Sequence, residues 1–118
     1  MVLVDTSIWI NHFRKKNDAL ISLLEQTEVC THPLVIGEIA CGNLRNRSEI
    51  LELFQSLPSA VIASDEEVHQ LIESKKLMGE GIGWIDAHLI ASSLLSGSPL
   101  WTGDKSLRII TASLGLLY

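Results

Sequence analysis

Four acidic residues stand where acids are unusual in this sequence. Asp5 directly follows the apolar run 2–4, and Asp104 follows the run 99–102. Glu38 and Asp86 each lie inside an apolar helical stretch. Because carboxylates are almost never fully buried unless they are paired or bound to something, this placement suggests a shared chemical task.

The chemistry that suits such a group is divalent-cation binding. Carboxylates held close together repel one another, and a hard cation relieves that repulsion. Mg²⁺ and Mn²⁺ prefer oxygen ligands, so an acids-only site predicts one of these ions as cofactor. Such an ion activates water and stabilises charge on phosphate oxygens, which makes a phosphodiester the expected substrate. We expect Asp5 and Asp86 to be the most direct ligands, with Glu38 and Asp104 completing the site through water or a second ion; which acid is the general base stays open.

Each acid also has a structural explanation. Asp5 and Asp104 could be helix N-caps, a position that favours Asp. Asp86 could complement the dipole in the first turn of its helix, and Glu38 could be a solvated surface residue. The joint pattern favours a site, because caps and surface acids would not be expected so regularly at strand ends or on adjacent helices facing one edge.

The elements that must position these acids alternate between short strands and helices. This alternation predicts an α/β fold with a parallel sheet covered by helices. Helical stretches separate the predicted strands, which are 2–4, 28–32, 60–63 and 99–102, with 115–118 as a closing strand or tail. Ligands bind at the carboxyl ends of the strands in open parallel sheets, so Asp5 and Asp104 are predicted to share one edge.

Composition limits the remaining possibilities. The 118 residues suffice for one domain, and 47% hydrophobic with 19% charged residues is a globular composition. The net charge of −5 argues against a broad basic nucleic-acid surface, although not against a local one beside a cation site. With only two cysteines, no leader and no apolar span, we expect a cytoplasmic protein without a disulfide framework or a membrane segment.

Four motifs in order carry a family resemblance: "VLVDTS", "PLVIGEIACG", "WIDAHLIAS" and "LWTGDKSL". Together they resemble the PIN-domain ribonucleases, in particular the VapC toxins of bacterial and archaeal toxin–antitoxin pairs. The resemblance implies one PIN domain over 1–118, with a three-layer α/β/α fold around a central parallel sheet. It also implies that Asp5, Glu38, Asp86 and Asp104 form the family's acidic quartet.

Further roles follow from the resemblance and from neighbouring residues. Thr6, Ser7 and Thr102 match the hydroxyl positions that accompany the quartet, and we expect Ser7 and Thr102 to orient carboxylates by hydrogen bonds. Substrate contacts are expected from cations near the acids, namely Arg14, Lys105 and Arg108.

The expected partners are an RNA substrate, a small VapB-like antitoxin that wraps the toxin, and a second copy in a homodimer. The alternative is a PIN-fold nuclease of RNA processing, or a non-catalytic PIN scaffold, outside a toxin–antitoxin pair. A P-loop enzyme is excluded because the motif is absent, and a haloacid-dehalogenase-like phosphotransferase would require a second Asp where Ser7 stands.

Other titratable residues are predicted to lie outside the site. Cys30, His32 and Cys41 match no common zinc spacing. His12, His69 and His88 are interpreted as surface residues on polar helical faces.

Overall fold

A short parallel sheet lies at the centre of the computed structural model, which describes all residues 1–118. The strand β1 (Val2–Val4) is in the middle, between β2 (Val29–Cys30) and β3 (Leu100–Trp101). Leu3 pairs with Cys30 on one side and with Leu100 on the other. All three residues of β1 are buried, as expected for a parallel sheet covered on both faces.

Two of the predicted strands are reduced to single bridges, one at each edge of the sheet. The prediction of a strand at 60–63 is wrong: only Ser59 bridges to Thr31, and the chain then leaves the sheet. The reason is a competing partner, because the Val61 N–H donates to Ser96 Oγ (2.8 Å) and not to a strand. At the other edge, the closing strand is a bridge between Leu100 and Leu117.

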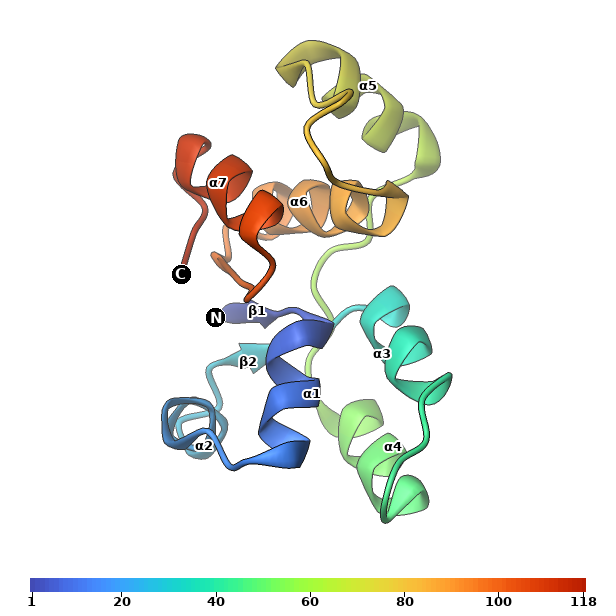
Figure 1. Cartoon of the computed structure of the whole chain (residues 1–118), viewed down its shortest axis with the longest axis vertical. Helices are drawn as coiled ribbons and strands as arrows, with labels where there is room; N and C mark the ends of the chain where they lie inside the picture. Colours follow the sequence, from blue (N-terminus) through green and yellow to red (C-terminus); the bar gives the residue numbers. More distant parts are fainter.

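Seven helices connect and cover the strands. They are α1 (Thr6–Arg14), α2 (Asp18–Glu25), α3 (Pro33–Ala40), α4 (Arg47–Ser56), α5 (Asp65–Lys75), α6 (Trp84–Ser96) and α7 (Lys105–Ser113). In Figure 1, α6 and α7 lie above the strands, and α1, α2 and α4 lie below them, so helices cover both sides. This arrangement confirms the predicted α/β fold.

Local sequence signals set several helix boundaries. Pro33 occupies the first turn of α3, where its missing N–H costs nothing. Ser64 and Glu67 form the predicted capping box of α5, with hydrogen bonds of 3.1 and 2.9 Å. Gly97 ends α6 in the left-handed conformation (φ 62°).

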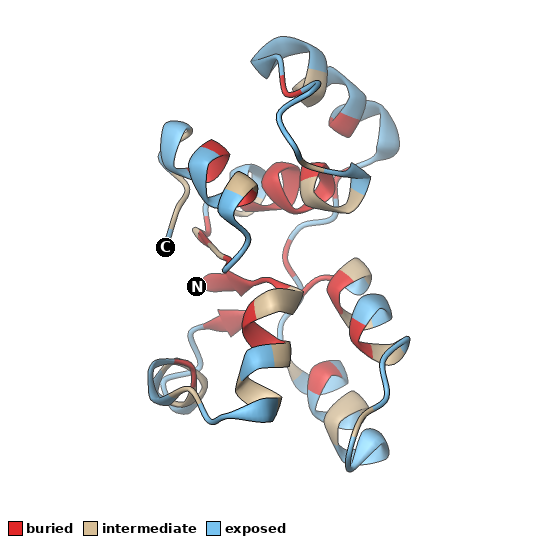
Figure 2. Cartoon of the chain, viewed as in Figure 1, coloured by how far each residue is buried: buried red, intermediate tan, exposed pale blue.

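The core surrounds β1 and extends along α6. Figure 2 shows the buried residues concentrated in the strands and in the middle of α6. Residues 87–93 of that helix are all buried, because α5 packs on its outer side and β3 contacts its inner side. The helix bearing Asp86 is therefore held from several directions. None of the seven helices has the length and apolar character needed to cross a membrane.

Candidate active site

Asp5 is the best-anchored acid of the chain. It follows the central strand directly and is 6% exposed. Its Oδ1 accepts a hydrogen bond from the Thr6 backbone N–H (2.7 Å), and its Oδ2 accepts from Ser7 Oγ (3.0 Å) and Thr102 Oγ1 (2.7 Å). An N-cap side chain normally bonds the second or third N–H of its helix, whereas Asp5 bonds the first. Its carboxylate is instead oriented across the sheet edge, toward Thr102.

The two hydroxyls that hold Asp5 have fixed orientations. Ser7 Oγ accepts from the Gly103 N–H (3.0 Å), and Thr102 Oγ1 accepts from the Asp104 N–H (3.1 Å). Each hydroxyl has only one proton to donate. Because its oxygen already accepts a hydrogen bond from a backbone N–H, the hydroxyl proton is free to be donated to Asp5. The network thereby connects the start of α1 to the turn between β3 and α7.

Asp104 caps α7 in the ordinary way. Its Oδ1 accepts from the Leu107 N–H (2.9 Å), so the cap interpretation is correct for this residue. The same placement brings it to the carboxyl edge of the sheet beside Thr102, because β3 ends one residue before that threonine. Asp104 can therefore cap α7 and at the same time belong to the acidic edge.

Glu38 reaches the edge from α3. Its exposed side chain accepts a hydrogen bond at Oε1 from Thr6 Oγ1 (2.8 Å). Thr6 also donates its backbone N–H to Asp5, so one threonine connects two of the acids. The structure thus brings Thr6, Ser7 and Thr102 into direct contact with the acids.

Asp86 is half-buried in the first turn of α6, where its Oδ2 accepts from the Gly83 N–H (3.1 Å). Burial raises the pKa of this carboxyl, the nearby charges of Asp5 and Asp104 raise it further, and the Gly83 hydrogen bond lowers it. The repulsion from two other acids places Asp5, Asp86 and Asp104 in one electrostatic environment.

Each of these acids keeps an open acceptor position, and three of them leave a whole oxygen without a protein donor. The uncommitted atoms are Asp86 Oδ1, Asp104 Oδ2 and Glu38 Oε2, and Asp5 Oδ1 accepts only one of its two hydrogen bonds. No three Asp, Glu, His or Cys side chains converge as a ready-made metal cage. The donor set is nevertheless all oxygen, which fits a cation that takes one or two carboxylates and fills its remaining positions with water.

The loop 77–83 positions Gly83 and therefore Asp86. Gly81 has φ +81°, and a Cβ there would lie 2.9 Å from Ser106 Oγ in the first turn of α7. The positive φ favours glycine at this position, and the close approach shows that the loop contacts Ser106. The loop is seated against the helix that Asp104 caps.

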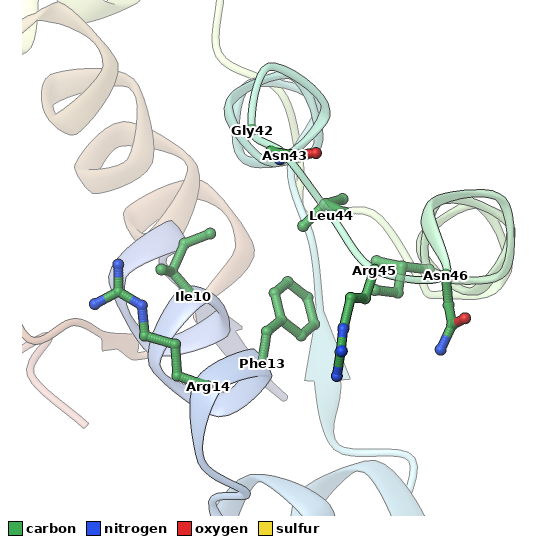
Figure 3. Close-up of a pocket in the computed structure, with 9 residues that line it drawn as sticks. Ile10, Phe13, Arg14, Gly42, Asn43, Leu44, Arg45 and Asn46 are labelled. Carbon is green, nitrogen blue, oxygen red and sulfur yellow. The ribbon is translucent and has the colours of Figure 1, made fainter.

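The three predicted substrate-contacting cations lie in different settings. Lys105 and Arg108 are exposed on α7, and Arg108 Nη1 donates to the Thr102 carbonyl (3.2 Å). Arg14 borders a cavity of about 550 Å³ between α1 and the loop before α4. Figure 3 shows Phe13 pointing from α1 toward Leu44, with Arg14 and Arg45 on either side.

Nearby Arg47 has a structural role. It donates to the Gly42 carbonyl (3.1 Å) and to the Ala40 carbonyl at the end of α3. Such bonds satisfy carbonyls that a helix end leaves without partners.

The structure corrects the prediction for one of the histidines. The prediction that His88 lies on the surface is wrong: it is 6% exposed, and its Nε2 lies 3.2 Å from Asp65 Oδ1. The ring of buried His32 is 6.4 Å away, and its Nδ1 accepts from the Leu34 N–H. A sequence signal for this burial existed, because the residues three or four positions from His88 in the helix are apolar or small.

The raised pKa of Asp86 leads to a stability prediction. A carboxyl with a raised pKa binds its proton more tightly in the folded state, so stability falls as pH rises above the ordinary range of an aspartate. Asp86→Asn removes that charge and keeps an oxygen for the Gly83 N–H. In chelator at pH 7, we expect the variant to melt on the order of a few degrees above the wild type, by calorimetry.

The difference should shrink as pH falls and Asp86 becomes protonated in the wild type. Glu52→Gln, an exposed acid on α4, serves as the control for a general charge effect. A variant that melts below the wild type at pH 7 would contradict the proposed repulsion.

Comparison with known proteins gives a family for this arrangement. Residues 2–112 match the PIN domain. Over 117 residues the chain is 40% identical to Ribonuclease VapC32 of Mycobacterium tuberculosis, from strain CDC 1551 / Oshkosh and from strain ATCC 25618 / H37Rv, covering 98% of this chain and 94% of each relative. With a family match over most of its length and relatives 40% identical to it, this chain belongs to the PIN-domain family and groups within it with the VapC proteins.

Proposed function

We propose that this chain is a divalent-cation-dependent endoribonuclease that hydrolyses RNA phosphodiester bonds with Asp5, Glu38, Asp86 and Asp104. The observation that carries the proposal is the hydrogen-bond network of Thr6, Ser7 and Thr102, which holds Asp5 beside Glu38 and Asp104 at the carboxyl edge of the sheet. Asp86 lies near enough for Asp5 and Asp104 to contribute to its raised pKa. Carboxylates that repel one another in the protein alone are suited to sharing a cation. The name of the relative, a ribonuclease, supports RNA as the substrate.

The hydroxyl network prepares Asp5 for this task. Ser7 and Thr102 together occupy Oδ2, and Thr6 occupies one position on Oδ1, so one acceptor position remains open on Oδ1. These three donors fix the orientation of the carboxylate. We propose that Asp5 and Asp86 contact the ion most directly, and that Glu38 and Asp104 act through water or a second ion.

Mg²⁺ or Mn²⁺ in this place would lower the pKa of the attacking water and supply positive charge beside the phosphate oxygens. The residues of the chain orient the four acids around the reacting phosphate. Lys105 and Arg108, on the helix that Asp104 caps, and Arg14, at the far end of α1, are proposed to contact flanking phosphates. Arg108 keeps several N–H groups for this purpose, since the structure commits only its Nη1 to a protein acceptor.

Cation dependence tests the central proposal. Purified protein should cleave single-stranded RNA with Mg²⁺ or Mn²⁺, stop in EDTA and recover when the cation is restored. Asp5→Asn keeps the size of the side chain but removes its charge, so we expect cleavage to fall at least about a hundredfold, a loss typical of an essential catalytic group. The measurement is the initial rate on an end-labelled oligonucleotide.

The matched control is Asp18→Asn, which changes an exposed acid at the start of α2. It should cleave like the wild type. Cleavage that persists in chelator would disprove the role of the cation.

Thr102 tests the supporting network. Thr102→Val preserves shape but removes the donor to Asp5 Oδ2 and the acceptor of the Asp104 N–H. Loss of such supporting contacts typically lowers metal affinity or activity about 10- to 100-fold, and we expect a loss of that size, measured as the cation concentration for half-maximal cleavage.

Thr111→Val is the matched control, because this threonine is equally buried and bonds only to carbonyls within α7. It should change stability without changing the cation requirement, and Thr102→Ser should restore activity. Equal cation requirements for Thr102→Val and the wild type would exclude the positioning role.

We further propose that this enzyme is a cytoplasmic toxin neutralised by a small VapB-like antitoxin, and that it forms a homodimer. The relationship to VapC32 supports the antitoxin, which would place a Lys or Arg among the four acids. Exposed apolar residues are compatible with a homodimer: Val61 and Leu95 are about half exposed and line one hollow.

Expression in a bacterial host tests the toxin proposal. The wild type alone should arrest growth, and Asp86→Asn at the same protein level should not, because the acidic site is incomplete. The readout is colony count after induction, with soluble protein measured in parallel. Normal growth with abundant soluble wild-type protein would contradict toxicity, and co-expression of a small gene adjacent to the toxin gene should restore growth.

A further inference from the structure

A second, smaller cavity lies next to the acidic edge. It has a volume of about 180 Å³ and lies between the C-terminal end of α5, the loop 77–83 and the first turn of α6. Its side-chain walls are apolar and consist of Ile72, Leu77, Met78, Ile82, Trp84 and Ala87. None of the lining residues is charged, so the cavity suits an uncharged ligand and not a phosphate or a metal ion.

Gly83 joins this cavity to the acidic site. It lines the cavity, and its backbone N–H holds Asp86 Oδ2 at 3.1 Å. Trp84 follows it directly and precedes Asp86 by two residues on the same helical turn. A ligand in the cavity would therefore lie beside Asp86, which is proposed to hold the cation at the reacting phosphate.

Trp84 provides an aromatic surface with a fixed orientation. Its side chain is 41% exposed although it packs against two imidazoles. His69 lies 4.8 Å from its ring at an interplanar angle of 43°, and His88 lies 4.8 Å away edge-on at 83°. His88 is buried and paired with Asp65. An indole held in this way loses little conformational freedom when a flat ligand stacks on it.

The loop 77–83, which supplies much of the cavity lining, is also held in place. At Gly81 it approaches Ser106 in the first turn of α7 so closely that a Cβ would lie 2.9 Å from the serine Oγ. This contact is adjacent to Asp104, which caps the same helix. Trp84 and the loop are therefore both tied to helices that carry acids of the proposed site.

We propose that this cavity binds one unpaired nucleobase of the RNA substrate, next to the scissile phosphate, with Trp84 as its stacking surface. The inference rests on the proposed ribonuclease function and adds a determinant of where the enzyme cuts. A nucleobase is flat and uncharged, matches a small apolar cavity, and arrives attached to the phosphate that the cation at Asp86 is proposed to bind. Stacking on an aromatic side chain contributes measurably to single-strand binding and tolerates different bases.

Variants of Trp84 test this subsite with the full chain. Trp84→Leu keeps an apolar wall without an aromatic face, and Trp84→Phe keeps a smaller face. We expect kcat/KM on a single-stranded oligoribonucleotide to fall about tenfold for Leu and less for Phe, the range expected for losing one stacked base. Leu53→Ala is the matched control, because it alters an exposed apolar residue on α4, outside the cavity. Thermal melting should show that all variants are folded.

An abasic substrate shows whether Trp84 contacts a base. Oligonucleotides lacking one base at each position around the cleavage point should include one that the wild type cleaves about tenfold more slowly. The Trp84→Leu variant should cleave this abasic oligonucleotide as fast as the intact one, because the variant already lacks the aromatic ring on which the base would stack.

Fluorescence in EDTA gives a readout without cleavage. Trp84 is more exposed than Trp9 or Trp101, so it dominates quenching by acrylamide. Intact oligonucleotide should protect it, and the abasic oligonucleotide identified above should protect it less.

The outcomes of these experiments test the base-binding subsite separately from the proposed ribonuclease activity. A wild type that cleaves RNA, with Trp84→Leu equal to it in rate and site preference, overturns the subsite and leaves the ribonuclease proposal standing. A wild type that neither binds nor cleaves RNA with any divalent cation overturns both. A Trp84→Leu protein that changes only its oligomeric mass would show a contact between copies of the chain and would also overturn the subsite.

Discussion

The site depends on the hydrogen bond between Thr102 and Asp5. It joins the end of the central strand to the end of β3, and it is buried. Around it, Ser7 binds the turn that precedes Asp104, and Thr6 binds Glu38. One carboxylate is thus held by three donors, and the residues that hold it also contact Glu38 and the Asp104 backbone. The cost of burying Asp5 is offset because its Oδ2 is fully satisfied.

Asp86 is the one acid of the four that has no contact with this hydrogen-bond network. Its position comes from α6, which is buried over most of its length, and from the Gly83 N–H at the end of a loop seated on α7. Burial in this helix is the main reason why the pKa of Asp86 is raised. The nearby charges of Asp5 and Asp104 raise it further, and no protein cation pairs with the carboxyl to compensate. In the proposed enzyme, the missing compensation is supplied by the metal.

The positions of Asp5 and Asp104 at the sheet edge were predictable from sequence because they depend only on which residues follow a strand. An acid after a buried strand must lie at the carboxyl end of that strand, and parallel pairing then brings Asp5 and Asp104 to the same edge. The strand at 60–63 could not be excluded in this way, since the Val61 N–H is removed from the sheet by Ser96, thirty-five positions later in the chain. The cavity beside Trp84 was similarly hidden, because its walls come from α5, a loop and α6, and because its orienting imidazole, His88, is buried by tertiary packing.

The partners in the central hydrogen bond are 97 residues apart in the chain. During synthesis, Asp5 leaves the ribosome long before Thr102 exists, and β1 lacks its β3 neighbour until then. Contacts of such long sequence separation form late in folding. The proposed nuclease is therefore without its completed site until Thr102 and Asp104 have been synthesised, so a nascent chain shorter than this poses little danger to the messenger and the ribosomal RNA beside it.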